Sequence, residues 1–240
     1  MKALYALHRK IASFDFFSWL VLVKAMGYTE VVFDTRSPRT NKWSEAEVRR
    51  RFETILWPGV ALAGLKASLG TEGDDPVHTD ARHLIDWVRA GKAFEPLASP
   101  LPPAEVRYTV TLREEPRIPA RNSNLPAWRT FAAEIGALVI EDHAVNPIDL
   151  HTRMALYAGA DMNFFVVNGP MHVCSLAGYP LLCFACNVCE GGFAATGIPF
   201  GGQYPWANER QHFIWEDDSL PNLRRHFGRW LAETQCAQAA

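Results

Sequence analysis

The chain has 240 residues, of which 48% are hydrophobic and 21% are charged, and its formal net charge at pH 7 is −2. These proportions are typical of a water-soluble globular protein, and the length suits one large domain or two small ones. Because positive charge is not in excess, we expect no nucleic-acid partner. Any anionic ligand must therefore be bound by a local group of residues.

Targeting signals are not evident in the sequence. The apolar stretch at residues 14–23 is far shorter than the roughly 20 residues of a membrane-spanning helix, contains Asp15, and is not followed by a small-residue cleavage site. We interpret it as a buried amphipathic helix and expect no integral membrane segment. Five cysteines, an odd number, do not match a secreted disulfide framework, so we expect a cytoplasmic protein.

The first part of the chain reads as strand, helix, strand and helix, followed by a region of weak periodicity. Gly27 suits the end of the first helix, and Ser44, with acidic residues behind it, suits the start of the second. After Pro58-Gly59 the pattern weakens up to a proline-rich linker. The predicted elements are strands 3–7 and 29–33, helices 14–26, 44–56 and 80–90, and the linker 96–103.

Residues 105–240 show a clearer alternation of strand and helix patterns. The predicted strands are 105–113, 137–140, 164–167, 181–184 and 213–215, and the predicted helices are 125–135, one beginning at Pro147, 171–177 and 220–231. Alternating strands and helices predict parallel sheets. We therefore expect an α/β protein with two Rossmann-like halves, residues 1–104 and 105–240, of which the first is abbreviated.

The stretch from Met162 to Phe184 reads as strand, tight turn, helix and strand, a βαβ unit. Its turn is Asn168-Gly169-Pro170, followed by Met171 and His172. Glycine allows close backbone approach, and proline suits the first helical position. Such a helix start can bind a phosphate through free N–H groups, although glycine there can also serve packing alone. His172 could donate to a phosphate or base, or could simply pack.

A second candidate anion site follows the strand at 105–113. Arg113 ends that strand, and the loop beyond it contains Arg121-Asn122-Ser123. An arginine fork matches phosphate oxygens, and Asn or Ser can cap a helix or supply short donors. A solvated basic loop with an ordinary helix cap is the alternative.

These two motifs carry a resemblance to a known family. The residues Gly169-Pro170-Met171-His172, with Ser175-Leu176-Ala177 after them, resemble a segment of metal-independent GT-B glycosyltransferases, and within them of heptosyltransferase-like enzymes. Members of the family have an acidic residue next to the turn, where this chain has Asn168. The Arg121-Asn122-Ser123 loop is similar to an arginine-asparagine-serine loop in related glycosyltransferases. The chain has no D-x-D triplet, which the other main glycosyltransferase fold uses to bridge a metal and diphosphate.

The resemblance implies a GT-B-like fold and a hexosyl- or heptosyltransferase that takes a nucleotide-sugar donor and a carbohydrate or lipid-linked acceptor, in surface polysaccharide or glycoconjugate synthesis. It implies donor binding by Arg113, Arg121, Asn122, Ser123 and residues 168–172 in the second half, without a metal or cofactor. Asp15 in the first half would remove the acceptor proton, although Ser13 or Asp15 could merely cap a helix. A sugar-nucleotide epimerase and a non-catalytic binding module remain as alternatives.

Several other residues are weaker candidates. Asp34 is a reserve candidate for the base, and Glu141-Asp142-His143 could meet a ribose or base. Trp206 lies in a loop that could cover a ligand, or it could anchor that loop in the core. Cys183, Cys186 and Cys189 have a C-x₂-C-x₂-C spacing that a fourth ligand from Cys174, Cys236 or His172 could complete. Cys183 also fits a buried strand as a small apolar residue.

Overall fold

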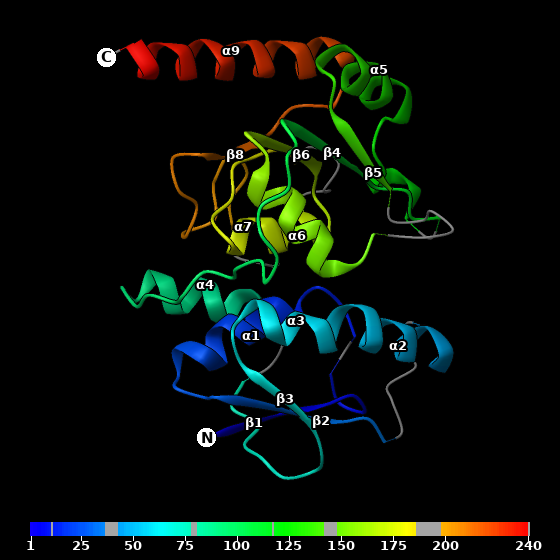
Figure 1. Ribbon diagram of the computed structural model, residues 1–240, viewed down its shortest axis with the longest axis vertical. Helices are drawn as coiled ribbons and strands as arrows, with labels where there is room; N and C mark the ends of the chain where they lie inside the picture. The colour runs from blue at the N-terminus through cyan, green and yellow to red at the C-terminus, as the bar shows by residue number, and fades with distance from the viewer. Residues whose placement is uncertain are drawn as a thin grey trace.

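The computed structural model describes residues 1–10, 12–36, 43–77, 81–116, 118–141, 148–185 and 198–239. These residues form an α/β fold in two parts (Figure 1), each with a parallel sheet. The strands of the first sheet are β1 (Lys2–Ala6), β2 (Glu30–Asp34) and β3 (Lys66–Leu69). Those of the second are β4 (Tyr108–Leu112), β5 (Leu138–Glu141), β6 (Met162–Val166), β7 (Leu181–Phe184) and β8 (Gln211–Ile214).

The first sheet has the strand order β1-β2-β3 and carries its helices on the side that faces the second half (Figure 1). These helices are α1 (Phe16–Ala25), α2 (Glu45–Arg51), a π-helical turn (Phe52–Leu56), α3 (Trp57–Leu62) and α4 (Ala81–Arg89). Ser44 caps α2 by accepting a hydrogen bond from the Glu47 amide at 3.2 Å. This part of the chain is thus an abbreviated Rossmann-like unit.

Three sequence expectations for this half were wrong. Helix α1 is buried on all sides from Phe16 to Val23 rather than amphipathic, because it lies between the first sheet and the second half. Pro58-Gly59 does not interrupt the helical run, since Pro58 stands in the first turn of α3, where its missing N–H is tolerated. Strand β3 has no counterpart among the predicted strands; its four residues are exposed or half-buried, so they lack a strong apolar pattern.

The second sheet has the order β5-β4-β6-β7-β8, with helices on both faces. Helices α5 (Leu125–Ile135) and α9 (Leu220–Ala239) cover one face, and α6 (Leu150–Gly159) and α7 (Gly169–Leu176) the other (Figure 1). The chain runs from β4 outward to β5 and then returns to β6 on the other side of β4. The strand order therefore reverses between β4 and β6, which is a topological switch point.

Alternate residues of the central strands face the two helix layers. Tyr108, Val110 and Leu112 of β4 share the face toward α5 and α9, as their spacing predicts. The opposite face of β4 carries Thr109 and Thr111, which are also buried; their hydroxyls bond to Asn163 at 2.6 Å and Tyr157 at 2.8 Å. Both faces of β4 are thus enclosed by protein.

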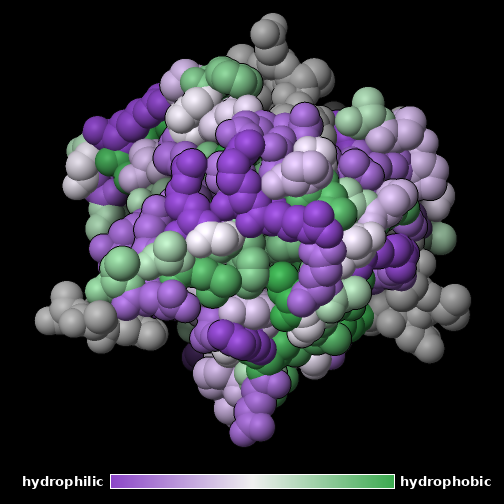
Figure 2. All heavy atoms as spheres, turned by 90° about the horizontal axis from the view of Figure 1, so that it is seen from above, coloured by the Kyte–Doolittle hydropathy of each residue, from purple (hydrophilic) through white to green (hydrophobic). Residues whose placement is uncertain are grey.

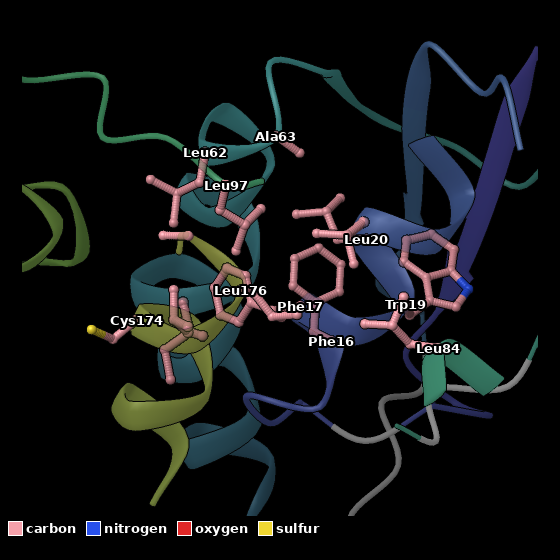
Figure 3. Packing of buried hydrophobic residues seen from close by; sticks show 14 of the residues in the cluster. Phe16, Phe17, Trp19, Leu20, Leu62, Ala63, Leu84, Leu97, Cys174 and Leu176 are labelled. Carbon is pink, nitrogen blue, oxygen red and sulfur yellow. The ribbon is translucent and has the colours of Figure 1, made fainter. Parts of the chain in front are cut away.

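The two halves share one hydrophobic core. Phe17 of α1, Leu62 of α3 and Leu176 of α7 belong to a single cluster of buried side chains, which Figure 3 shows as one layer together with Leu97 of the linker. The linker is held in place as well, because the Leu97 amide donates to Leu176 O at 3.1 Å. The predicted boundary at residue 104 falls between α4 and β4. Side chains fill the space between the two halves where α1 meets α7.

The outer surface at the α9 end is mainly hydrophilic, with apolar side chains visible between polar ones (Figure 2). Helix α9 continues past the predicted end at residue 231 to Ala239. Among the described residues, none of the helices combines the length and the apolar character required to cross a membrane.

Candidate functional site

The sequence candidates of the second half gather at the switch point of its sheet. Arg113 follows the last residue of β4, and Asn168 follows β6 by two residues. Strands β4 and β6 are hydrogen-bonded neighbours in which Thr111 is paired with Phe165. Their carboxyl ends, and the loops that follow, therefore lie side by side. This is the position at which open α/β sheets bind ligands.

The turn after β6 has most of its hydrogen-bond donors occupied. Asn168 caps α7, since its Oδ1 accepts from the Met171 amide at 2.8 Å, and Pro170 has no N–H. Among the amides of residues 169–171, the one of Gly169 forms no hydrogen bond with another described residue. Asn168 adds a second donor, because its buried Nδ2 has no hydrogen-bond partner among the described residues.

Gly169 approaches protein rather than open space. A Cβ placed on it would lie 2.3 Å from Cδ2 of Phe14, which belongs to the loop between β1 and α1. The need for glycine at this turn is thus explained by packing of the first half against the second, the alternative raised from the sequence. Pro170 and Met171 are buried in the same contact region.

The arginine loop is held by its own polar side chains. The Ser123 hydroxyl accepts from the Arg113 amide at 2.9 Å, and Asn122 Oδ1 accepts from the Glu115 amide at 2.7 Å. Asn122 and Ser123 therefore bind the backbone of the loop itself. The side chains of Arg113 and Arg121 are half-buried at its two ends.

An acidic residue that the sequence did not single out occupies the start of α5. Asp218 is buried, and its Oδ2 accepts from the Asn124 amide at 2.8 Å and from the Trp128 indole at 2.7 Å. The positive end of α5 is therefore neutralised by the protein's own carboxylate.

His172 links the two halves. Its Nε2 lies 2.6 Å from Oγ of Ser18, a buried residue of α1. Burial lowers the pKa of His172 to about 4, although the nearby Asp15 carboxylate acts in the opposite direction and raises it. The imidazole is therefore neutral at pH 7. Its ring packs against Tyr204 and Trp206, with centroids 5.8 and 6.1 Å away.

Trp206 is an anchor of its loop in the core. Its indole N–H donates to Ser175 Oγ at 2.9 Å, and its ring stacks on Tyr204 at 4.5 Å. Of the two interpretations of this residue, the structure thus favours the core anchor over a side chain that covers a ligand.

Asp15 is exposed at the edge of this contact region. It occupies the N-cap position of α1 without making a side-chain capping hydrogen bond, so the capping alternative does not apply to it. Instead, Ser13 Oγ donates to Asp15 Oδ2 at 2.8 Å. One carboxylate oxygen is held by the protein, and the group is exposed to solvent.

The reserve candidates are occupied or lie outside the described residues. Asp34 is buried and forms a two-pronged pair with Arg36, whose guanidinium lowers its pKa. Glu141 pairs with Arg129 at 2.7 Å, and Asp142 and His143 lie outside the described residues. Of the two carboxylates considered as a base, Asp15 is therefore more exposed to solvent than Asp34.

The cysteine cluster is only partly described. Cys174 and Cys183 are fully buried, and Cys183 lies inside β7 as a small apolar residue would. Cys186 and Cys189 lie outside the described residues. Within the part of the chain that the structure describes, no three His, Cys, Asp or Glu side chains come together in a way that could hold a metal ion.

The residues Ser18, His172 and Asp15 have the composition of a nucleophilic triad, but their geometry does not suit one. Ser18 is 1% exposed, so a substrate carbonyl cannot reach its hydroxyl. The Ser18–His172 pair is therefore a link between halves. Ser18 did not stand out in the sequence, because its partner His172 is 154 positions away and only the fold brings the two residues close.

Comparison with known proteins identifies the architecture. No protein-family model and no curated protein sequence matches the chain. Among solved structures, the heptosyltransferase WaaC of E. coli with ADP superposes on 97% of this chain and 99% of its own, with a TM-score of 0.50 and 11% sequence identity. The fold is GT-B-like. At this level of identity the GT-B-like fold is what the two proteins share, and the α/β prediction is confirmed.

Proposed function

We propose that this protein is a metal-independent glycosyltransferase that moves a sugar from a nucleotide-sugar to an acceptor hydroxyl. One observation carries the proposal. The loop with Asp15 lies against the turn that follows β6, beside the switch point that also holds Arg113. The residue that we assign as proton acceptor thus lies close to the edge that we assign to the anion, as transfer between two substrates requires.

The donor diphosphate is assigned to the switch point. Arg113 and Arg121 provide two positive charges at the loop after β4, and the Gly169 amide and Asn168 Nδ2 provide donors after β6. The ADP in the structure of the E. coli enzyme supports a nucleoside diphosphate as the leaving group. These groups would stabilise the negative charge that develops as the diphosphate departs. Asn122, Ser123 and His172 act by positioning these groups.

Asp15 is assigned as the general base. Its carboxylate takes the proton of the acceptor hydroxyl as the oxygen attacks the anomeric carbon, and the bond to the diphosphate breaks in the same step. A single displacement of this kind inverts the anomeric centre. Ser13 positions the carboxylate through the bond to Oδ2.

The wider role follows the resemblance and the expected compartment. We assign the protein to the cytoplasm and to the synthesis of surface polysaccharide or another glycoconjugate, with a carbohydrate or lipid-linked acceptor. An epimerase would return a changed sugar still attached to the nucleotide, and a binding module would release neither free nucleotide nor transferred sugar. Analysis of the products formed from a labelled nucleotide-sugar separates these outcomes.

The experiment begins with a thermal-shift screen of nucleoside diphosphates and their sugars, with and without a chelator. A ligand at a hundredfold excess over its dissociation constant stabilises the fold by about 2.7 kcal/mol, which gives a measurable shift. A shift that the chelator abolishes would contradict the metal-independent mechanism.

The nucleotide found in this way is then titrated by calorimetry. Arg121→Ala should weaken binding by roughly 10- to 100-fold, the effect of losing a charge-assisted hydrogen bond. Asp15→Asn should leave the affinity unchanged and reduce transfer by about 100-fold or more. Arg129→Ala, which removes an exposed arginine of α5, is the control. Unchanged nucleotide affinity in Arg121→Ala would contradict the phosphate-binding role of Arg121. Full transfer activity in Asp15→Asn would exclude Asp15 as the base.

A further inference from the structure

A hollow of about 110 Å³ lies at the carboxyl edge of the first sheet. Each strand of that sheet contributes one lining residue: Leu7 follows β1, Thr35 follows β2 and Leu69 ends β3. The opposite wall is formed by Arg49, Phe52 and Glu53. In open α/β sheets the carboxyl edge is the ligand-binding edge, so its position makes this hollow a candidate site.

Two large apolar side chains are exposed at or near the hollow. Leu69 is 64% exposed at the end of its strand, and Trp57, which packs beside the lining ring of Phe52, is 40% exposed. The ring of Phe52 packs against that of Phe33, with ring centroids 5.1 Å apart. Packed aromatic rings and an exposed leucine therefore lie beside the hollow.

The charges of the hollow balance one another. Arg49 and Glu53 line it with opposite signs, and Arg49 is also bound to Glu45 at 2.6 Å. The switch point of the second half, in contrast, holds two arginines. The described lining residues carry no excess of positive charge of the kind that a phosphate would need, so they suit an uncharged group.

The local backbone is also unusual. The lining residue Phe52 begins a five-residue π-helical turn, Phe52–Leu56, inside an otherwise α-helical run from Glu45 to Leu62. Such turns occur frequently at functional sites, because they displace one or two side chains from the regular helical spacing. Here the turn presents Phe52 and Glu53 to the hollow.

We propose that this hollow binds the apolar portion of a neutral acceptor, an alkyl or aryl group attached to the sugar or alcohol that receives the transferred residue. The inference rests on the proposed function, since the hollow lies on the sheet edge from which the Asp15 loop departs. An enclosed apolar cavity of about 150 Å³ holds one benzene ring. An open hollow of about 110 Å³ therefore takes a short alkyl segment or part of a ring.

The test measures binding of a neutral alkyl glycoside, an aryl glycoside and the phosphorylated alkyl glycoside, all below micellar concentration, by calorimetry and by the fluorescence of the tryptophans. Wild-type protein should bind at least one neutral glycoside more tightly than the phosphorylated one. Leu69→Asp should weaken this binding by about 10-fold. Leu101→Asp is the control, because Leu101 is similarly apolar and 43% exposed but does not line the hollow.

Comparison of the alkyl and aryl compounds identifies the source of the apolar group. Equal affinity in wild type and Leu69→Asp, or preference for the phosphorylated glycoside, would overturn the inference even if nucleotide binding and transfer persist. If neutral glycosides bind in a way that depends on Leu69, but the protein neither binds nucleotides nor transfers a sugar, both the acceptor assignment and the proposed function would be overturned. Nucleotide affinity, measured separately in each variant, distinguishes the two failures.

Discussion

Among single residues, Gly169 shows how one motif is compatible with two causes. A glycine before a helix can allow close approach of a phosphate or close packing, and the structure places the ring of Phe14 where a Cβ of residue 169 would lie. An alanine at this position would place its Cβ 2.3 Å from Phe14 Cδ2. Gly169→Ala should therefore destabilise the protein by about 1–3 kcal/mol through overpacking, as measured by urea unfolding.

Two further variants make this test specific. Gly228→Ala is the matched control, because no atom lies within 4 Å of its added Cβ in helix α9, and it should stabilise the protein by about 0.5–1 kcal/mol. Combining Gly169→Ala with Phe14→Ala should cost less than the two single changes added together. Additive effects would mean that the two residues do not compete for the same space.

At the scale of elements, helices α1 and α7 are connected by the Ser18–His172 bond, and this contact makes stability depend on pH. Burial lowers the pKa of His172 to about 4 from an ordinary 6.5. Between these values the unfolded chain binds a proton that the folded protein does not. The contribution of neutral His172 is thus present above pH 6.5 and is lost as the pH falls toward 4.

The expected loss between pH 7 and pH 5 is about 2 kcal/mol in the free energy of unfolding. His172→Gln keeps a polar partner for Ser18 and removes the titrating group, so its stability should fall less over this range. Urea unfolding of both proteins at the two pH values measures the difference. Parallel losses in the two proteins would show that His172 does not carry the effect.

At the scale of the whole molecule, the shared core predicts that the halves unfold together. Buried side chains of α1, α3 and α7 form one cluster, and the linker is hydrogen-bonded to two of these helices. Leu176, which is 1% exposed, should therefore support both halves. Leu176→Ala should lower the free energy of unfolding by about 2–5 kcal/mol.

Hydrogen exchange followed by mass spectrometry reports on the halves separately. In Leu176→Ala, amides of β2 and β4 should lose protection by the same amount, since both exchange through one global opening. Leu138 of the edge strand β5 is 41% exposed, so Leu138→Ala should change the protection of the β2 and β4 amides only slightly. Loss of protection in β4 with full protection in β2 would show that the halves open independently.

The type and order of most elements could be predicted from the amino-acid pattern, because the causes of these elements are local. The apolar runs of β4, β6 and β7, the Ser44 cap and the glycine after α1 act within a few residues, and they were placed correctly. Strand β3 and the helical run through Pro58 were not predicted. Strand β3 lacks an apolar pattern, and the helical run continues only because Pro58 lies in the first turn of α3.

The contacts of the candidate site residues could not be predicted in this way, because most of them join distant parts of the chain. Ser13 meets Asp15 within one loop, but Ser18 meets His172 across 154 positions and Asp218 meets the α5 start across more than 90. Sequence spacing carries no record of such contacts, because they arise when packed layers bring distant loops to one sheet edge. The strand reversal between β4 and β6 is likewise a property of the folded sheet, and it places Arg113 beside the Asn168 turn.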